Sequence, residues 1–174
     1  MSQNTKRKEL VCKLLSCIPA ILMMAVIFYF SSRTAGQSSK QSQAVVQSIS
    51  GWNQILLFFG VSPEDLPNAI VAVEIFVRKL GHIIEFLLLT VFVLIPHVKW
   101  CSGWIRRYAV AALFSLCYAI SDEVHQIFVD GRGPSATDVL IDSIGIFLAL
   151  MVFYFFEKRR KKRKIIKDKE GKSS

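Results

Sequence analysis

The sequence predicts an all-α protein of the membrane, an integral four-helix bundle with an additional amphipathic helix in the first external loop. Composition indicates the class, since 52% of the 174 residues are hydrophobic and 13 are Phe, more than a soluble chain of this length usually contains. Four apolar stretches approach or reach the roughly 20 residues that a helix needs to cross a bilayer. Most of the 22 Lys and Arg residues lie beside the same ends of these stretches, which is typical of a multi-pass protein.

The third of the four expected spans has the weakest signal. Its apolar core extends only from Tyr108 to Ile120, and a run of that length also suits a buried helix of a soluble domain. Four such stretches in one short chain favour the membrane interpretation. The spans are expected at about residues 14–30, 80–96, 104–126 and 139–156.

Basic residues predict the orientation of the chain. Lys and Arg are concentrated before the first span, between the second and third, and after the fourth, and loops rich in these residues stay on the cytoplasmic side. We therefore expect a basic cytoplasmic N-terminus (1–13), a four-span membrane domain (14–156) and a basic cytoplasmic tail (157–174). The basic run from Lys158 to Lys164 fits this signal better than nucleic-acid binding. A basic start before a short apolar run also resembles a cleavable signal, but we favour an uncleaved first span.

The first external loop, from Ser31 to about Arg78, is long enough to have structure of its own. One helix is predicted within it, because its apolar residues recur every three or four positions. Such a helix suits the outer membrane interface, and packing against the spans explains it equally well. A further helix is expected to begin at Pro67 and to continue to Ile95. The stripe of the first helix consists of Val45, Ile49, Trp52, Leu56 and Phe59.

Polar and ionisable residues interrupt the outer ends of spans two, three and four. Such residues are rare inside a membrane and usually face the bundle interior or a water-filled cavity. Small residues beside them would let a neighbouring helix approach closely. Glu123 lies off these faces and is expected to be a solvated loop or interface charge. Helical spacing predicts one face for each set: Glu74, Arg78, His82 and Glu85; Ser115, Tyr118, Asp122, His125 and Gln126; Asp138, Asp142, Gly145 and Ala149.

The alternating direction of the spans brings these groups to the external end of the bundle. His82 and His125 are expected in one layer, with the carboxylates of Glu85, Asp122 and Asp142 in a deeper one. Because imidazole titrates near neutral pH and a carboxylate can orient it, these five residues are the candidates for catalysis. The competing explanation is structural, since buried polar contacts also fix how helices pack. The candidates for binding a substrate are Arg78, Lys79, Gln126, Arg132 and Asp138.

A divalent metal is an alternative for the same cluster. His82 with Glu85, and Asp122 with His125, have the i, i+3 spacing of metal-binding pairs in helical bundles. Two imidazoles and two carboxylates could hold zinc, iron or manganese. A hydrogen-bonded ladder produces the same spacing, so the sequence leaves the cofactor open.

Four segments resemble the signature of the VanZ-like membrane protein family. They are Lys79 to Phe86, Ser121 to Phe128, Gly131 with Arg132, and Asp138 to Gly145. The resemblance extends from about Ile27 to Phe153, and its departures from the family pattern affect no candidate site residue. It implies a protein of the bacterial cytoplasmic membrane with a role at the envelope, because the member that names the family is associated with low-level resistance to teicoplanin, a lipoglycopeptide.

Hypotheses of different classes follow from the cluster and the resemblance. The first is an outward-facing polar pocket that acts on, or binds, an envelope lipid or a lipid-linked cell-wall precursor. The second is a non-catalytic protein that binds or transports a lipid or the antibiotic, and the third is a structural membrane scaffold. A single chain of four spans without repeats is small for a transporter, which counts against the transport hypothesis. A homodimer would have enough spans to remove this objection. The expected partners are a membrane lipid or lipid-linked wall precursor, and no nucleic acid.

Overall fold

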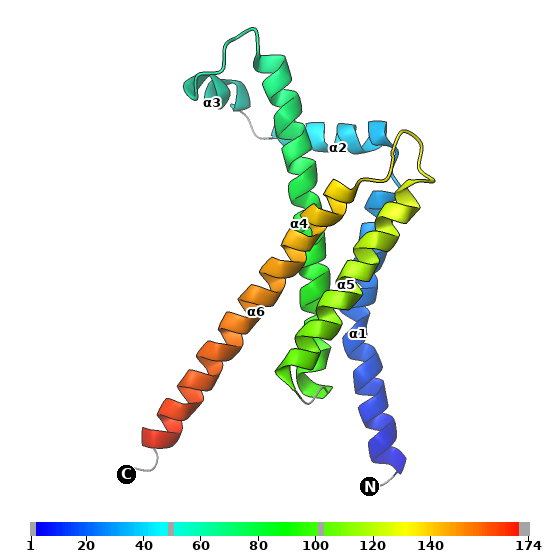
Figure 1. Ribbon diagram of the computed structural model, residues 1–174, viewed down its shortest axis with the longest axis vertical. Coiled ribbons are helices and arrows are strands. Elements are labelled where there is room, and N and C mark those ends of the chain that lie inside the picture. The colour runs from blue at the N-terminus through cyan, green and yellow to red at the C-terminus, as the bar shows by residue number, and fades with distance from the viewer. Residues whose placement is uncertain (1–2, 49–50, 101–102, 171–174) are drawn as a thin grey trace.

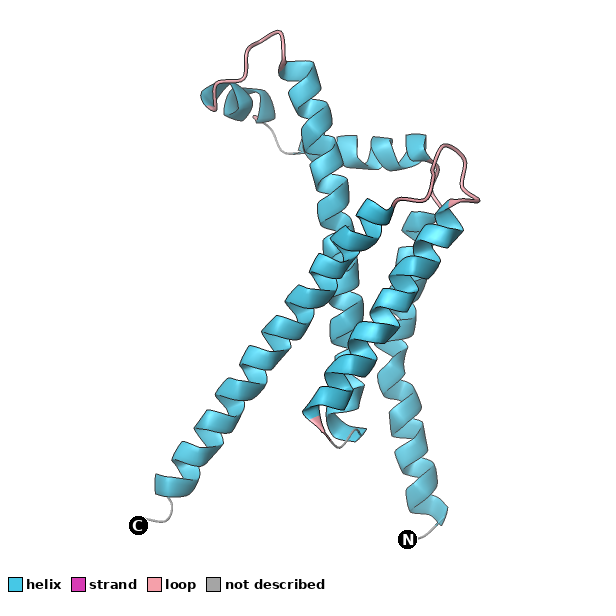
Figure 2. Ribbon diagram, in the orientation of Figure 1, coloured by secondary structure: helices cyan, strands magenta, loops and turns pink. Residues whose placement is uncertain are grey.

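The computed structural model describes residues 3–48, 51–100 and 103–170, and no strand occurs among them. These residues form helices joined by short connections (Figure 2). Ile49 and the last part of the expected basic tail, 171–174, lie outside the described residues. The helices are α1 (Gln3–Ser31), α2 (Ala35–Ser48), α3 (Trp52–Phe58), α4 (Leu66–Trp100), α5 (Trp104–Gln126) and α6 (Ala136–Glu170).

The four long helices alternate in direction (Figure 1). α1 and α5 run toward the end where α2, α3 and the connection between α5 and α6 lie, and α4 and α6 run back from it. Both ends of the described chain therefore lie at the opposite end of the molecule. The placement of both termini on the cytoplasmic side of a membrane stays a prediction. We call the other end, with α2 and the α5–α6 connection, the loop end.

Within the described residues, three helical segments are long and apolar enough to cross a membrane: Arg7–Ser31, Leu66–Pro96 and Ala136–Arg163. They correspond to the first, second and fourth expected spans. α5 is not among them, because Arg106 and Arg107 lie near its start and Asp122 and Glu123 near its end. It nevertheless packs against both α4 and α6. The all-helical class is confirmed, and a fourth crossing by α5 stays a prediction.

The prediction of a single amphipathic helix in the first external loop is wrong. The segment is divided between α2 and α3, and Gly51 precedes α3 with a φ of 108°, a left-handed conformation that interrupts a helix and favours glycine. The buried face of α2 is also a different one, formed by Ser38, Ser42 and Val46. Val45 of the predicted stripe is 49% exposed. The apolar periodicity of the sequence correctly predicted helix in this segment. It did not predict that a largely polar face of α2 would be the buried one.

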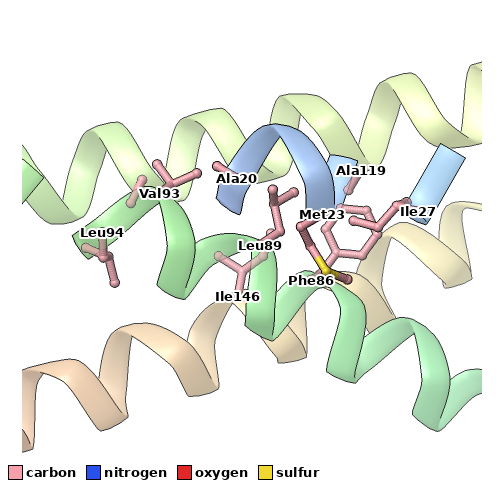
Figure 3. Packing of buried hydrophobic residues seen from close by; sticks show 10 residues of the cluster. Ala20, Met23, Ile27, Phe86, Leu89, Val93, Leu94, Ala119 and Ile146 are labelled. Atoms are coloured by element: carbon pink, nitrogen blue, oxygen red, sulfur yellow. The ribbon is translucent and has the colours of Figure 1, made fainter. Parts of the chain in front are cut away.

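α4 is the central helix, since it contacts every other helix. It begins one residue before the expected Pro67 and continues past Ile95. The buried apolar core gathers around its middle (Figure 3). Phe86 and Leu89 of α4 are fully buried there against side chains of α1, α5 and α6. The partners drawn in Figure 3 include Ala20, Met23 and Ile27 of α1, Ala119 of α5 and Ile146 of α6.

Gly145 of α6 makes the closest helix crossing with α4. A Cβ at this position would lie 2.2 Å from the carbonyl oxygen of Ile83 and 3.0 Å from the backbone nitrogen of Leu87. Ala149, one turn further along α6, is fully buried as well. The expected close approach at the small residues of the fourth span is therefore confirmed, and α4 is the helix that approaches.

Replacing Gly145 with Ala is expected to lower the melting temperature of the purified protein, because the added methyl group collides with the backbone of α4. Overpacking of this kind costs roughly 1–3 kcal/mol. Gly81→Ala is the matched control, since Gly81 is also within a helix and a Cβ there meets nothing within 4 Å. Thermal unfolding in detergent measures both variants. Equal melting temperatures for the two would contradict the tight crossing.

Reporter fusions test whether α5 crosses the membrane. Alkaline phosphatase needs disulfides that form outside the cytoplasm. With four crossings and cytoplasmic termini, a fusion after Gly133 is expected to be active and a fusion after Glu170 inactive. If α5 stays on one side, the two activities exchange, because the chain then crosses an odd number of times. A fluorescent protein that folds in the cytoplasm serves as the reciprocal control.

Candidate functional site

The crossing of α4 and α6 brings His82 and Asp142 together near the loop end. His82 Nδ1 lies 3.7 Å from Asp142 Oδ1 and 4.0 Å from Glu85 Oε2. Asp142 has no exposed surface, and neither of its carboxylate oxygens has a hydrogen-bond partner within the described part of the chain. An isolated ionisable group at membrane depth is costly and is usually functional. His82 and Asp142 therefore form the centre of the candidate site.

Asp122 of α5 extends this cluster toward α1. Gln126 Nε2, one turn further along α5, donates a hydrogen bond to Asp122 Oδ2 at 3.1 Å. Both side chains are buried, and the buried Ser31 at the end of α1 lies beside the Asp122 carboxylate. Asp122 is within electrostatic range of both histidines, His82 and His125.

His125 faces α1 and not the pair at the α4–α6 crossing. Its Nε2 is hydrogen-bonded to Ser32 Oγ at 3.1 Å, and its ring lies 4.5 Å from that of Phe28, centroid to centroid. Ser32 Oγ also donates to the carbonyl oxygen of Phe28 at 2.6 Å, which leaves the Ser32 oxygen to accept from the imidazole. Sequence reasoning did not assign Ser32 a role. Its signal in the sequence was its place in the Phe30, Ser31, Ser32 junction at the end of the first span, which belongs to the family resemblance.

Glu123 corrects a second expectation, because it is 5% exposed and not a solvated charge. Its Oε2 accepts a hydrogen bond from the backbone N–H of Ser135 at 2.8 Å. Ser135 in turn caps α6, since its Oγ accepts from the backbone N–H of Asp138 at 3.3 Å. Glu123 therefore ties the end of α5 to the start of α6. Spacing along one helix could not reveal a partner that lies in the following loop.

A cavity of about 490 Å³ opens beside His82. Two cations, Arg78 and Arg132, line it together with His82 and Glu85. The rest of the lining comes mainly from α2 and is partly hydroxyl-bearing and partly apolar. Arg78 is held against α2, because its Nη2 donates to Ser39 Oγ at 2.9 Å. The complete lining is Phe30, Ser38, Gln41, Ser42, Ala44, Val45, Val77, Arg78, Gly81, His82, Glu85 and Arg132.

The loop between α5 and α6 supplies Arg132 to this cavity. Gly131 turns the chain with a φ of 74°, and a Cβ there would lie 3.3 Å from the Cβ of Ala35. The backbone N–H of Ala35 donates to the carbonyl oxygen of Asp130 at 3.3 Å, so the loop is attached to the start of α2. Burial, followed by the nearby charge of Arg78, lowers the pKa of Arg132 from its usual value. Two guanidinium groups thus repel each other across the cavity.

The structure places the predicted site residues in different surroundings. Arg78, His82, Glu85 and Arg132 line the cavity. Asp142, Asp122 and Gln126 are buried, and Asp138 is within electrostatic range of His82 and Arg132. Lys79 is not part of the described cavity lining, and His125 contacts α1.

The residues proposed as metal ligands do not fit a metal site in this arrangement. Among the described residues, no three His, Cys, Asp or Glu side chains come together in a group that could hold a metal ion. His82 faces Glu85 and Asp142, whereas His125 is bonded to Ser32. The histidine of the α4 pair and the histidine of the α5 pair therefore contact different residues and do not face each other.

Comparison with known proteins gives a family match over most of the chain. The sequence model of the VanZ/LLP1 family matches residues 16–157. An uncharacterized membrane protein of Bacillus subtilis (strain 168), YwnJ, is 36% identical over 88 residues, which cover 51% of this chain and 56% of YwnJ. The similarity to YwnJ thus spans about half the length of each protein. No solved structure matches.

Replacing Glu123 with Ala is expected to destabilise the protein by about 1–3 kcal/mol, because the partly buried N–H of Ser135 loses its acceptor. Glu64→Ala is the control, since Glu64 is exposed and such surface changes usually stay within about 0.5 kcal/mol. Thermal unfolding in detergent compares the two variants with the wild-type protein. A melting temperature unchanged by Glu123→Ala would show that the carboxylate is not part of the α5–α6 connection.

Proposed function

Since this chain belongs to the VanZ/LLP1 family, we propose that its cavity binds the anionic head of an envelope lipid or lipid-linked cell-wall precursor at the outer face of the bacterial cytoplasmic membrane. The observation that carries this proposal is the pair of guanidinium groups, Arg78 and Arg132, in one cavity of about 490 Å³. Arg is the residue best suited to phosphate, because its planar donors match the phosphate oxygens. A volume of this size suits a small ligand or a lipid head.

The wall of the cavity is amphiphilic, as a lipid ligand requires. Phe30, Val45 and Val77 contribute apolar surface, and Ser38 and Ser42 of α2 contribute hydroxyl groups. A bound anion would reduce the repulsion between the two guanidinium groups. Asp122, Glu123 and Asp138 already compensate part of the charge of Arg132, so the cavity favours an anion without depending on one for folding.

His82 is the imidazole in the lining of this cavity and could transfer a proton. Its Nδ1 faces Asp142 and Glu85, and carboxylates on that side of the ring orient the imidazole and stabilise its cation. The other ring nitrogen, Nε2, is then the one available to a ligand. In a catalytic version of the proposal, His82 is the general acid or base and Asp142 positions it. In a binding version, the imidazole contributes a hydrogen bond to the lipid head.

Low-level resistance to teicoplanin is the physiological consequence we propose. A protein that holds or alters a wall precursor at the outer face competes with a lipoglycopeptide for the same lipid. The main alternative is a non-catalytic binder or transporter, which needs the same cavity but leaves the lipid unchanged. A pure scaffold would need the buried charges but not the cavity.

Arg78→Gln is expected to weaken binding of a polyprenyl phosphate at least tenfold, because a charge-assisted hydrogen bond contributes about 1.5–3 kcal/mol. Lys79→Gln removes the same charge from the neighbouring position, which is not part of the described cavity lining, and is expected to bind like the wild-type protein. Titration of the lipid into protein in detergent, with zwitterionic phosphatidylcholine as the reference of zero net charge, measures this. Equal losses in both variants would contradict binding at the cavity.

His82→Gln distinguishes catalysis from binding. If His82 transfers a proton, the variant is expected to retain at least a tenth of the wild-type affinity for the polyprenyl phosphate but to lose any change in lipid species and any teicoplanin phenotype. General acid or base catalysis typically contributes 10²–10⁴-fold. Lipid profiles of cells that express the wild-type protein, the variant or neither provide the measurement. Identical profiles in all three would contradict the catalytic version and leave the binding version.

A further inference from the structure

A second cavity, of about 840 Å³, lies between α4 and the C-terminal half of α6. Beyond their crossing at Gly145, the two helices diverge toward the end that holds both termini (Figure 1). This groove is therefore at the opposite end of the molecule from the candidate site. Its lining is Val91 of α4 with Val152, Phe153, Phe156, Glu157, Arg159, Arg160, Lys161 and Arg163 of α6.

The groove changes from apolar to cationic along α6. Val152, Phe153 and Phe156 form its inner wall, and the cations follow within the next two turns. At 1.5 Å per residue, the step from Phe156 to Arg163 is about 10 Å. An amphiphile with an apolar chain and an anionic head has this order of groups.

The acidic residue of the groove does not neutralise these cations. Glu157 Oε1 pairs with Arg107 Nη1 at 3.0 Å, and its Oε2 accepts from the Tyr108 hydroxyl at 3.3 Å. Both oxygens are thus bound to the start of α5. Within the described residues, no ion pair involves Arg159, Arg160, Lys161 or Arg163. The charges at the rim remain for a ligand.

From this geometry we infer that the α4–α6 groove is a binding site for an anionic phospholipid of the leaflet next to the termini. The acyl chain lies along Val152, Phe153 and Phe156, and the head contacts Arg160 and Arg163. Lys and Arg beside a membrane contribute about 1 kcal/mol each toward anionic lipids. The inference does not depend on the function proposed for the loop end.

The test compares two pairs of cations on the same helix. Arg160→Gln with Arg163→Gln removes two charges that line the groove, and Lys158→Gln with Lys162→Gln removes two that do not. Native mass spectrometry of the full-length protein counts bound phosphatidylglycerol against phosphatidylcholine. We expect about tenfold weaker phosphatidylglycerol binding for the groove pair and less than a twofold change for the control pair.

Three results would overturn the site. Equal losses in both pairs would mean that the basic segment attracts lipid by charge alone. Equal binding of phosphatidylglycerol and phosphatidylcholine by the wild-type protein would remove the role of the cations. Loss of a dimer mass in the groove pair, with lipid binding unchanged, would assign the groove to a second copy of the chain. Melting temperatures of both pairs establish that the variants are folded.

Discussion

The close crossing of α4 and α6 at Gly145 is the contact on which the rest of the arrangement depends. No side chain separates the helices there, since a Cβ would lie 2.2 Å from a carbonyl oxygen of α4. Asp142 precedes Gly145 by almost one turn, so the same approach presses its carboxylate against α4, where His82 lies 3.7 Å away. Beyond Gly145 the helices diverge, and the groove lined by Phe153 and Arg160 opens between them. The buried polar pair and the open cationic groove thus lie on either side of the same crossing.

Around this crossing, polar contacts hold the loop end together where apolar packing is sparse. Glu123 binds the backbone of Ser135 at the start of α6, and Arg78 binds Ser39 of α2. The backbone N–H of Ala35 donates a hydrogen bond to the carbonyl oxygen of Asp130 in the α5–α6 loop. These contacts hold α2 and the α5–α6 loop beside the cavity, and Arg132 of that loop lines it. The structural and functional explanations of the buried charges are therefore compatible, because different residues serve each: Glu123 fixes the loop, whereas Asp142 has no hydrogen bond among the described residues.

The two cavities give the molecule different chemistry at its two ends. At the loop end, a histidine and carboxylates accompany the cations, so proton transfer is available there. At the end with the termini, cations adjoin an apolar wall and the one acidic residue of the groove is already paired, so binding alone is available. The two proposals, a lipid head in the cavity at the loop end and an anionic phospholipid in the α4–α6 groove, are both consistent with this asymmetry.

The sequence alone determined the helical class, the long helices and the faces of α4 and α6 that carry polar residues, because helical periodicity and apolar length depend only on local spacing. It also predicted that Gly145 permits a close approach, since a missing side chain is visible in the sequence. Only the tertiary structure decided which helix approaches, that His82 pairs with Asp142 while His125 turns to Ser32, and that Glu123 is buried. It also replaced the expected loop helix with α2 and α3. These outcomes depend on contacts between residues far apart in the chain, and the spacing along one helix does not specify its partner.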